Sequence, residues 1–267
     1  MDLTNVQKTA LMTMYGKALD ARADDPILGD TMADAAVRKM DFDFDTLKLP
    51  SGGRISLPVR AKQLDGWTRE FLAAHRDGVV LHLGCGLDTR VHRVDPGPDV
   101  RWYDVDLPEI VSLRRQLYPS RAGYELVSRS ITEPGWVEEL AADRPVLVIG
   151  EGLVMHVPTA EVVALFRRIM GAFPSGQFVF DVYAASTAKV VTLASKLGRA
   201  PVQLHTGLPQ ALRAEVPELK LTDSVPFLTL PELVSRMSGT LFGRLYFRAI
   251  EAGWTRDSIL HLRYRFG

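Results

Sequence analysis

Apolar residues follow two different periods along this chain. In the first third they recur every three to four positions, through “TNVQKTALMTMYGKALDAR”, over 31–40 and again at Leu64, Trp67 and Phe71, which predicts helices. From residue 79 short apolar runs alternate with amphipathic stretches. The predicted strands are 79–83, 100–105, 124–128, 145–150 and 177–182, and the predicted helices between them are 107–117, 133–142 and 159–172. Strands separated by such helices indicate βαβ units and a parallel sheet covered on both faces.

The segments outside this alternating region are less regular. Residues 49–58, “LPSGGRISLP”, are predicted to form a loop because of their Gly, Ser and Pro content. Residues 183–214 are predicted to hold helical pieces and a loop that form a lid over the sheet. Three further elements are predicted: a strand near 218–223, a helix carrying Leu230, Leu233, Val234, Met237 and Leu241 on one face, and a half-exposed final strand in “SILHLRYRF”.

The length is sufficient for one large α/β domain with a lid. We therefore expect a single domain over 1–267, an α/β fold with N-terminal helices and a helical lid insertion. Its expected parts are an N-terminal helical cap (1–78), a cofactor-binding core (79–182), a lid and substrate segment (183–245) and a C-terminal strand region (246–267).

Composition narrows the functional classes. The chain has 32 Lys and Arg residues against 32 Asp and Glu residues, so no net charge attracts nucleic acid or an anionic membrane. No apolar run reaches transmembrane length, and “MDLTNVQKTA” lacks a signal-peptide pattern, so we expect a cytoplasmic protein. The single cysteine, Cys85, excludes an intramolecular disulfide framework and a multi-cysteine metal site. We expect no metal.

The stretch “VVLHLGCGLDTR” places Gly84 and Gly86 directly after a predicted buried strand. In doubly wound sheets ligands bind outside the carboxyl ends of the strands, where the first turn lets backbone approach the ligand. An acidic residue about 20 positions later usually accepts from the ribose hydroxyls. Asp104 and Asp106 in “RWYDVDLPEI” lie at that distance, so the pattern predicts a cofactor that contains a nucleoside.

The third glycine of a dinucleotide fingerprint is absent. That position is Thr89, and the bulky Arg90 follows it. Because this glycine allows close packing of the helix that binds a pyrophosphate, its absence disfavours NAD. The pattern favours S-adenosylmethionine, which has no pyrophosphate.

Purely structural interpretations also fit these residues. Two glycines often do no more than shape a turn. Asp106 is a candidate helix N-cap, because Glu109 completes a capping box and Pro108 suits a first helical turn. One carboxylate can both cap and bind, so the interpretations are compatible. Asp104 has two candidate partners, Arg90 and Arg101.

Three motifs, “VVLHLGCGLDTR”, “YDVDLPEI” and “VLVIGEGLVMHVP”, occur in this order. With them the chain resembles the leucine carboxyl methyltransferase family, and most closely its bacterial branch that acts on small molecules. The segments “TALMTMYGKALDAR…DPILGD” and “LPVRAKQLD” are also similar to that branch. The resemblance covers about residues 5–182 and continues more weakly to the end. It implies a class I, Rossmann-like methyltransferase fold: a seven-stranded, mostly parallel sheet whose last strand is antiparallel.

The resemblance also implies S-adenosylmethionine as cofactor and S-adenosylhomocysteine as product. The turn formed by Gly84, Cys85 and Gly86 would lie against the methionine part of the cofactor. Asp106, which Leu107 follows in “VDLP”, would accept from the ribose hydroxyls.

At other positions of the implied cofactor site, this chain matches the family at some residues and departs from it at others. Arg60 would bind the cofactor carboxylate, and Lys17 is a second candidate cation. Glu151 of “GEGL” would lie by the methionine portion and the substrate entrance. Where the family usually has Asp-Leu beside the adenine, this chain has Ser130 and Ile131. A neutral serine is expected to hold the adenine amino group more weakly than a carboxylate.

The acceptor decides whether a base is needed. An ionised carboxylate has no proton to lose, so its methylation requires mainly alignment and exclusion of water. A phenol or another hydroxyl must lose a proton, and His156, at the family's usual tyrosine position, is the candidate base. Alternatively His156 merely fills that position. His205 in “QLHTGLP” is a candidate substrate contact or an exposed loop residue.

These observations leave three functional hypotheses. The first is an O-methyltransferase acting on a carboxyl or phenolic group of a small molecule in polyketide or other secondary metabolism. The second is a nicotinamide-dependent oxidoreductase, against which Thr89 counts. The third is a repurposed fold, such as a cyclase, that binds the cofactor without methyl transfer, which Ser130 favours. We expect the first, with a small-molecule acceptor and neither nucleic acid nor membrane as partner; the oligomeric state stays open.

Overall fold

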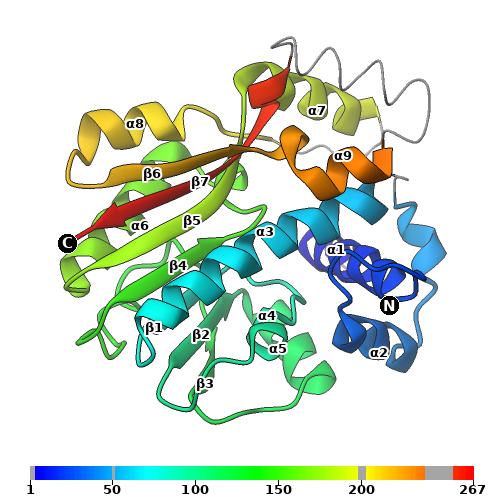
Figure 1. Cartoon of the computed structure of the whole chain (residues 1–267), viewed down its shortest axis with the longest axis horizontal. Helices are drawn as coiled ribbons and strands as arrows, with labels where there is room; N and C mark the ends of the chain where they lie inside the picture. Colours follow the sequence, from blue (N-terminus) through cyan, green and yellow to red (C-terminus); the bar gives the residue numbers. More distant parts are fainter. Residues whose placement is uncertain (1–3, 50–51, 198–202, 238–254) are drawn as a thin grey trace. The chain divides into compact units, whose positions relative to one another are not determined.

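The computed structural model describes residues 4–49, 52–197, 203–237 and 255–267. Its strands form a 7-stranded sheet of order β3-β2-β1-β4-β5-β7-β6 (Figure 1). The strands are β1 (Val79–Leu83), β2 (Arg101–Asp106), β3 (Tyr124–Ser128), β4 (Val146–Gly150), β5 (Gly176–Tyr183), β6 (Lys220–Pro226) and β7 (Ile259–Phe266). β7 pairs antiparallel with both β5 and β6, whereas β1, β2 and β4 have parallel partners. The predicted mostly parallel seven-stranded fold is confirmed.

The described helices match the predicted alternation in most places. The α-helices are α1 (Asn5–Ala21), α2 (Thr31–Lys39), α3 (Gly53–Ala74), α4 (Arg90–Val94), α5 (Pro108–Leu117), α6 (Thr159–Ala172), α7 (Ala185–Leu197), α8 (Leu208–Glu215) and α9 (Pro231–Met237). Short 3-10 helices are η1 (Phe44–Leu47), η2 (Val154–His156), η3 (Phe227–Thr229) and η4 (Arg256–Ser258). No described helix combines the length and apolar character needed to cross a membrane. Leu241, predicted on the helix that includes α9, lies outside the described residues.

One compact unit comprises Met1–Gly78 and Gly84–Ser130. Its first helix begins with a capping box, in which Thr4 Oγ1 accepts from the backbone N–H of Gln7 at 3.2 Å. The apolar side of α1 packs in a buried cluster with residues of α2 and α5, and Leu87 belongs to the same cluster. Because Leu87 follows Gly86 directly, its burial ties the glycine turn to the N-terminal helices.

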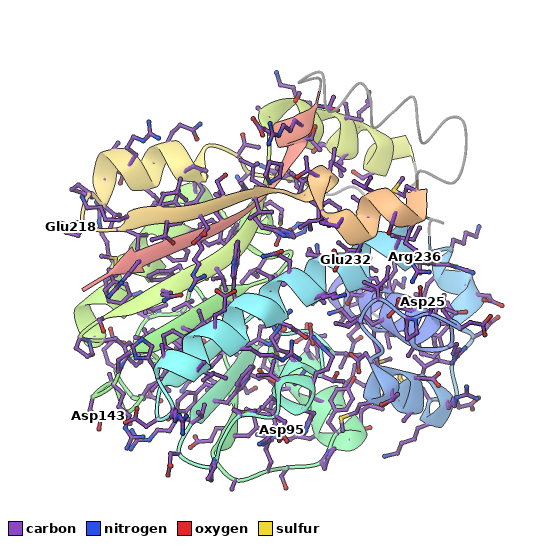
Figure 2. The ribbon with its side chains drawn as sticks, viewed as in Figure 1. Asp25, Asp95, Asp143, Glu218, Glu232 and Arg236 are labelled. Atoms are coloured by element: carbon purple, nitrogen blue, oxygen red, sulfur yellow. The ribbon has the colours of Figure 1, made fainter. Side chains whose placement is uncertain are left out.

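The second compact unit comprises Val79–Leu83 and Ile131–Gly267. Every residue of β1 and of β4 is buried, as expected for strands covered on both faces. Phe166 of α6 stacks on Phe178 of β5 with 4.1 Å between ring centroids. Phe180 of β5 in turn stacks on Tyr264 of β7. Aromatic packing therefore joins α6, β5 and β7. Asp95 and Glu218, labelled in Figure 2, are exposed, in contrast to the buried charges of the first unit.

Two of the predicted elements are wrong. The predicted loop 49–58 ends early, because α3 begins at Gly53 and contains Pro58. Pro58 lies near the start of the helix, and burial of this residue and Val59 outweighs the lost hydrogen bond. The predicted helix 133–142 is a series of turns. Gly135 has a φ of +94°, which a helix does not allow, and the buried Trp136 donates through Nε1 to the Ile131 carbonyl at 3.2 Å.

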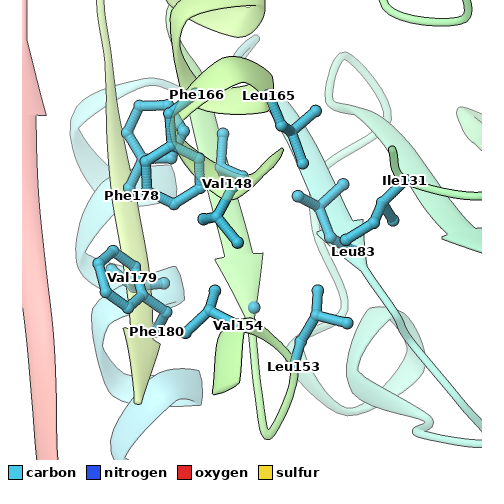
Figure 3. Close-up of a pocket in the computed structure, with 12 residues that line it drawn as sticks. Leu83, Ile131, Val148, Leu153, Val154, Leu165, Phe166, Phe178, Val179 and Phe180 are labelled. Atoms are coloured by element: carbon cyan, nitrogen blue, oxygen red, sulfur yellow. The ribbon is translucent and has the colours of Figure 1, made fainter. Parts of the chain in front are cut away.

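A small apolar cavity lies within the second unit, lined by residues of β1, β4, β5 and α6 (Figure 3). Its volume is ≈ 10 Å³, far too small for a substrate. Gly150, at the end of β4, lines this cavity. A Cβ atom there would meet Phe180, Val154 and Leu153 at 3.6–3.8 Å, which is ordinary contact.

We expect Gly150→Ala to raise the free energy of unfolding by about 0.4–1 kcal/mol, because alanine restricts the unfolded chain without strain in the folded one. The melting temperature, measured by circular dichroism, should rise by roughly 1–4 °C. Gly176→Ala is the matched control in the adjacent strand. Its Cβ would clash with the Val146 carbonyl oxygen, so Gly176→Ala should destabilise the protein by about 1–3 kcal/mol. Equal effects at the two glycines would contradict the prediction.

Candidate functional site

The glycine turn after β1 has a left-handed backbone. Gly84 and Gly86 both have φ of +54°, a region that costs other residues about 1–2 kcal/mol. A Cβ at Gly86 would meet just one atom within 4 Å, the Ala10 Cβ at 3.8 Å. The backbone conformation, and not crowding within the described residues, therefore requires glycine at position 86.

Asp106 accepts a backbone hydrogen bond at each carboxylate oxygen, one of them from the glycine turn. Oδ2 accepts from the Gly86 N–H at 2.7 Å, and Oδ1 accepts from the Leu107 N–H at 2.7 Å. The predicted capping box is wrong, because the N-cap of α5 is Leu107 and it has no side-chain cap bond. Pro108 takes the first helical turn as expected. Each carboxylate oxygen has a second lone pair, so Asp106 can hold the turn and still accept from ribose hydroxyls.

Asp104 is buried and forms its ion pair with Arg114 of α5, which was not among its predicted partners. The Tyr124 hydroxyl donates to Asp104 Oδ2 at 2.7 Å, and the Trp102 indole N–H donates to Oδ1 at 2.8 Å. Burial alone would lower the pKa of Arg114, but Asp104 raises it well above the usual range. Arg114 therefore stays charged. Arg114 also donates to the Gly86 carbonyl at 2.9 Å. Asp104 therefore supports the turn indirectly, by fixing this arginine.

A buried ionic cluster surrounds the residues that follow the turn. Lys17 Nζ of α1 lies 2.5 Å from Asp88 Oδ2. Arg93 of α4 binds Asp88 at 2.9 Å and Asp65 of α3 at 2.8 Å, and Arg90 binds the other oxygen of Asp65 at 2.7 Å. These residues connect α1 and α3 to the start of α4. Lys17, predicted as a cofactor ligand, is thus part of an internal ion pair.

The cluster extends to the chain before α2. Asp30, the N-cap of α2, lies 2.7 Å from Arg93 Nη1 and accepts from the Thr89 hydroxyl at 2.7 Å. The sequence pattern suggests Asp104 as a partner for Arg90 and no partner for Thr89, whereas Arg90 pairs with Asp65 and Thr89 donates to Asp30. The sequence signal for this cluster is the high density of Asp and Arg residues among the apolar residues near the turn. Within the named cluster the three carboxylates balance three cations, Lys17, Arg90 and Arg93.

The remaining predicted residues of this unit differ in exposure. The Cys85 thiol is buried, and burial raises its pKa well above the usual range, which makes it a poor nucleophile. Arg60 is half-buried on α3, and Ser130 is half-buried after β3.

The other predicted residues belong to the second unit. Glu151 follows β4, and the next residue, Gly152, donates its N–H to Asp181 Oδ1 at 2.6 Å. The His205 N–H donates to the Met155 carbonyl at 2.7 Å. Segment 203–207 therefore lies against η2, which ends at His156, and the two predicted histidines come from adjacent segments. His156 is exposed and His205 half-buried, whereas Ile131 is buried and lines the cavity described above.

Comparison with known proteins identifies the family. The family model for leucine carboxyl methyltransferase matches residues 10–170. The tetracenomycin polyketide synthesis O-methyltransferase TcmP of Streptomyces glaucescens is 36% identical over 233 residues, 86% of each chain. The chain belongs to the leucine carboxyl methyltransferase family. The S-adenosyl-L-methionine-dependent methyltransferase dpfgK of Gibberella zeae is 31% identical, with 67% of this chain and 66% of the relative covered.

Solved structures support the fold of this family member. A DUF574 family protein from Streptomyces avermitilis has a TM-score of 0.60 at 17% identity, with 97% of both chains covered. An S-adenosylmethionine-dependent methyltransferase from Mesorhizobium loti has a TM-score of 0.52 at 14% identity, with 77% of this chain and 99% of that chain covered. The predicted class I methyltransferase fold is confirmed.

Asp65→Asn should lower the free energy of unfolding by about 3–5 kcal/mol, because it leaves buried positive charge without its counter-charge. The control is Asp34→Asn, which removes a carboxylate that pairs with the more exposed Arg22 and Arg38. That change should cost less than about 1 kcal/mol. Urea denaturation measures both, and a similar small cost for the two variants would contradict the assigned role of the buried cluster.

Proposed function

We propose that this S-adenosylmethionine-dependent methyltransferase acts on a carboxyl group of a small molecule in polyketide or other secondary metabolism. The observation that carries the proposal is the similarity, over 86% of the chain, to an O-methyltransferase of tetracenomycin polyketide synthesis. The family description, which names a carboxyl acceptor, supports a carboxylate as the nucleophile. Fold alone does not define an acceptor, so the experiments below test it.

For the cofactor we propose the turn of Gly84, Cys85 and Gly86 as the contact for the methionine part. Asp106, with Leu107 beside it, is proposed to bind the ribose. The fit rests on the orientation of the acceptor: two backbone N–H groups fix the buried Asp106 carboxylate in one orientation, as recognition of two adjacent hydroxyls requires.

Arg60 is our first candidate for the cofactor carboxylate. Lys17 is the weaker candidate. It pairs with the buried Asp88 in a cluster where three carboxylates offset three cations, so its charge is already matched by a carboxylate of the chain. We therefore propose that Lys17 acts mainly by fixing the residues after the turn. Ser130 and Ile131 stay proposed neighbours of the adenine, and Glu151 of the methionine portion.

Bound S-adenosylmethionine supplies a methyl group that is already electrophilic. The chain's own task is then to orient the acceptor oxygen and exclude water, and correct orientation is worth roughly 7–11 kcal/mol. An ionised carboxylate loses no proton, so no side chain has to act as a base. The buried, fixed turn described above is consistent with catalysis by positioning.

A hydroxyl acceptor is the second candidate. One observation favours it: segment 203–207 contacts η2, so the backbone at His205 lies beside the backbone next to His156. A histidine there would take the proton that a phenol must lose. Two further alternatives, a nicotinamide oxidoreductase and a cofactor-binding protein without methyl transfer, are separated from the proposal by the experiments that follow.

Asp106→Ala should weaken S-adenosylhomocysteine binding at least about tenfold, because hydrogen bonds to a charged group are worth roughly 1.5–3 kcal/mol. Isothermal titration calorimetry measures the affinity, with NADH as a second ligand that should not bind. The control is Asp143→Ala, at an exposed carboxylate of the second unit (Figure 2). Unchanged affinity in Asp106→Ala would remove this residue from the cofactor site.

His156→Phe should keep methyl transfer to a carboxylate within about threefold of wild type, since no proton has to be removed. The assay is transfer of a labelled methyl group to aromatic acids and to matched phenols, with His205→Phe tested in parallel. Loss of turnover on a phenol with cofactor affinity intact would instead establish the hydroxyl acceptor.

A further inference from the structure

Three successive carbonyl oxygens, those of Gly86 and the two residues that follow the glycine turn, accept hydrogen bonds from the last part of α5 and the residue after it. Arg114 Nη1 donates to the Gly86 carbonyl at 2.9 Å and to the Asp88 carbonyl at 2.7 Å. The Tyr118 hydroxyl donates to the carbonyl between them, that of Leu87, at 2.7 Å. Arg114 and Tyr118 are both buried. We call these two residues the carbonyl clamp.

The clamp is itself fixed from behind. The second terminal nitrogen of Arg114 pairs with Asp104 and donates to the Tyr124 hydroxyl at 2.9 Å. The guanidinium carbon lies 5.4 Å from the centroid of the Tyr118 ring, a cation–π distance. The arginine therefore has one orientation, and its charge strengthens the bonds it donates to the turn.

Gly86 is consequently held at both of its backbone polar groups. Its N–H donates to Asp106 and its carbonyl accepts from Arg114. A turn with two glycines has many accessible conformations, and a ligand that binds one of them loses affinity in proportion to the population of the others. Restricting the turn before binding avoids this loss.

We propose that Arg114 and Tyr118 are positioning residues for the cofactor, which set its affinity by holding the carbonyls of Gly86, Leu87 and Asp88. The proposal rests on the proposed function, in which this turn binds S-adenosylmethionine. Because the clamp acts through the turn, substituting either of its residues should weaken binding of the cofactor without altering binding of the acceptor.

Tyr118→Phe is the mildest test, because it removes one hydroxyl and leaves the ring under Arg114. Its affinity for S-adenosylhomocysteine, measured by calorimetry well below the melting temperature, should fall roughly 3- to 10-fold with one site per chain retained. Arg114→Lys keeps a positive charge but lacks the planar fork, in which one terminal nitrogen donates to both carbonyls while the other pairs with Asp104. It should therefore lose at least as much affinity. In steady-state assays the cofactor KM should rise while the acceptor KM stays constant.

Tyr264→Phe is the matched control, because it removes the hydroxyl of another buried tyrosine, on β7 of the second unit. It should leave the affinity unchanged. A purely structural role for the clamp would lower the melting temperature and the fraction of competent sites but not the affinity of the folded protein, and that result would overturn the proposal. If wild type binds no S-adenosylhomocysteine, the proposed function fails instead; if wild type binds and both clamp variants bind equally well, only the clamp is refuted.

Discussion

The first unit depends on the ion pairs and hydrogen bonds of Asp88. Its carboxylate pairs with Lys17 of α1 and Arg93 of α4, while its carbonyl accepts from Arg114 of α5. Its N–H donates to the Cys85 carbonyl and closes the glycine turn. One residue thus connects three helices to the segment proposed to bind the cofactor. A change in any of these helices would alter the backbone of the turn.

Such a cluster contributes more to a defined geometry than to net stability. Removing ions from water costs several kcal/mol each, and mutual attraction recovers this only when every group is paired. Here each of the three carboxylates of the cluster has a cation and a second donor; for Asp30 the second donor is Thr89. Because an incorrectly paired arrangement is expensive, the helices have few alternative positions. Glycines carry no side chain to define their own conformation, so the turn needs this surrounding frame.

Much of the fold could be predicted because the sequence patterns that indicate its strands and helices are local. The run at 79–83 is apolar except for His82 and forms β1 with the predicted bounds. Prediction failed where distant residues decide: α3 includes Pro58 because that face of the helix is buried, and the turns after residue 131 follow from the burial of Trp136. Arg114 could not be recognised either, since nothing in “LRRQL” distinguishes a buried arginine from a solvated one.

The candidate site shows the same division. Gly84, Gly86 and Asp106 were found because a strand, a turn and a carboxylate at fixed spacing form a local pattern. Lys17 and Asp88, by contrast, pair across 71 positions, and no spacing rule predicts which lysine meets which aspartate. Recognition of a family position therefore located Lys17 near the turn without revealing its partner.

Cofactor and acceptor binding place different demands on this chain. The turn proposed to bind the cofactor is fixed by charged, buried groups whose exchange is costly, so few substitutions of these groups leave its conformation intact. The segments around His156 and His205 are joined through backbone bonds, such as that from His205 to Met155, which depend little on side-chain identity. Side chains there can change while the loop path is kept. The segments proposed to contact the acceptor can therefore change without altering the glycine turn.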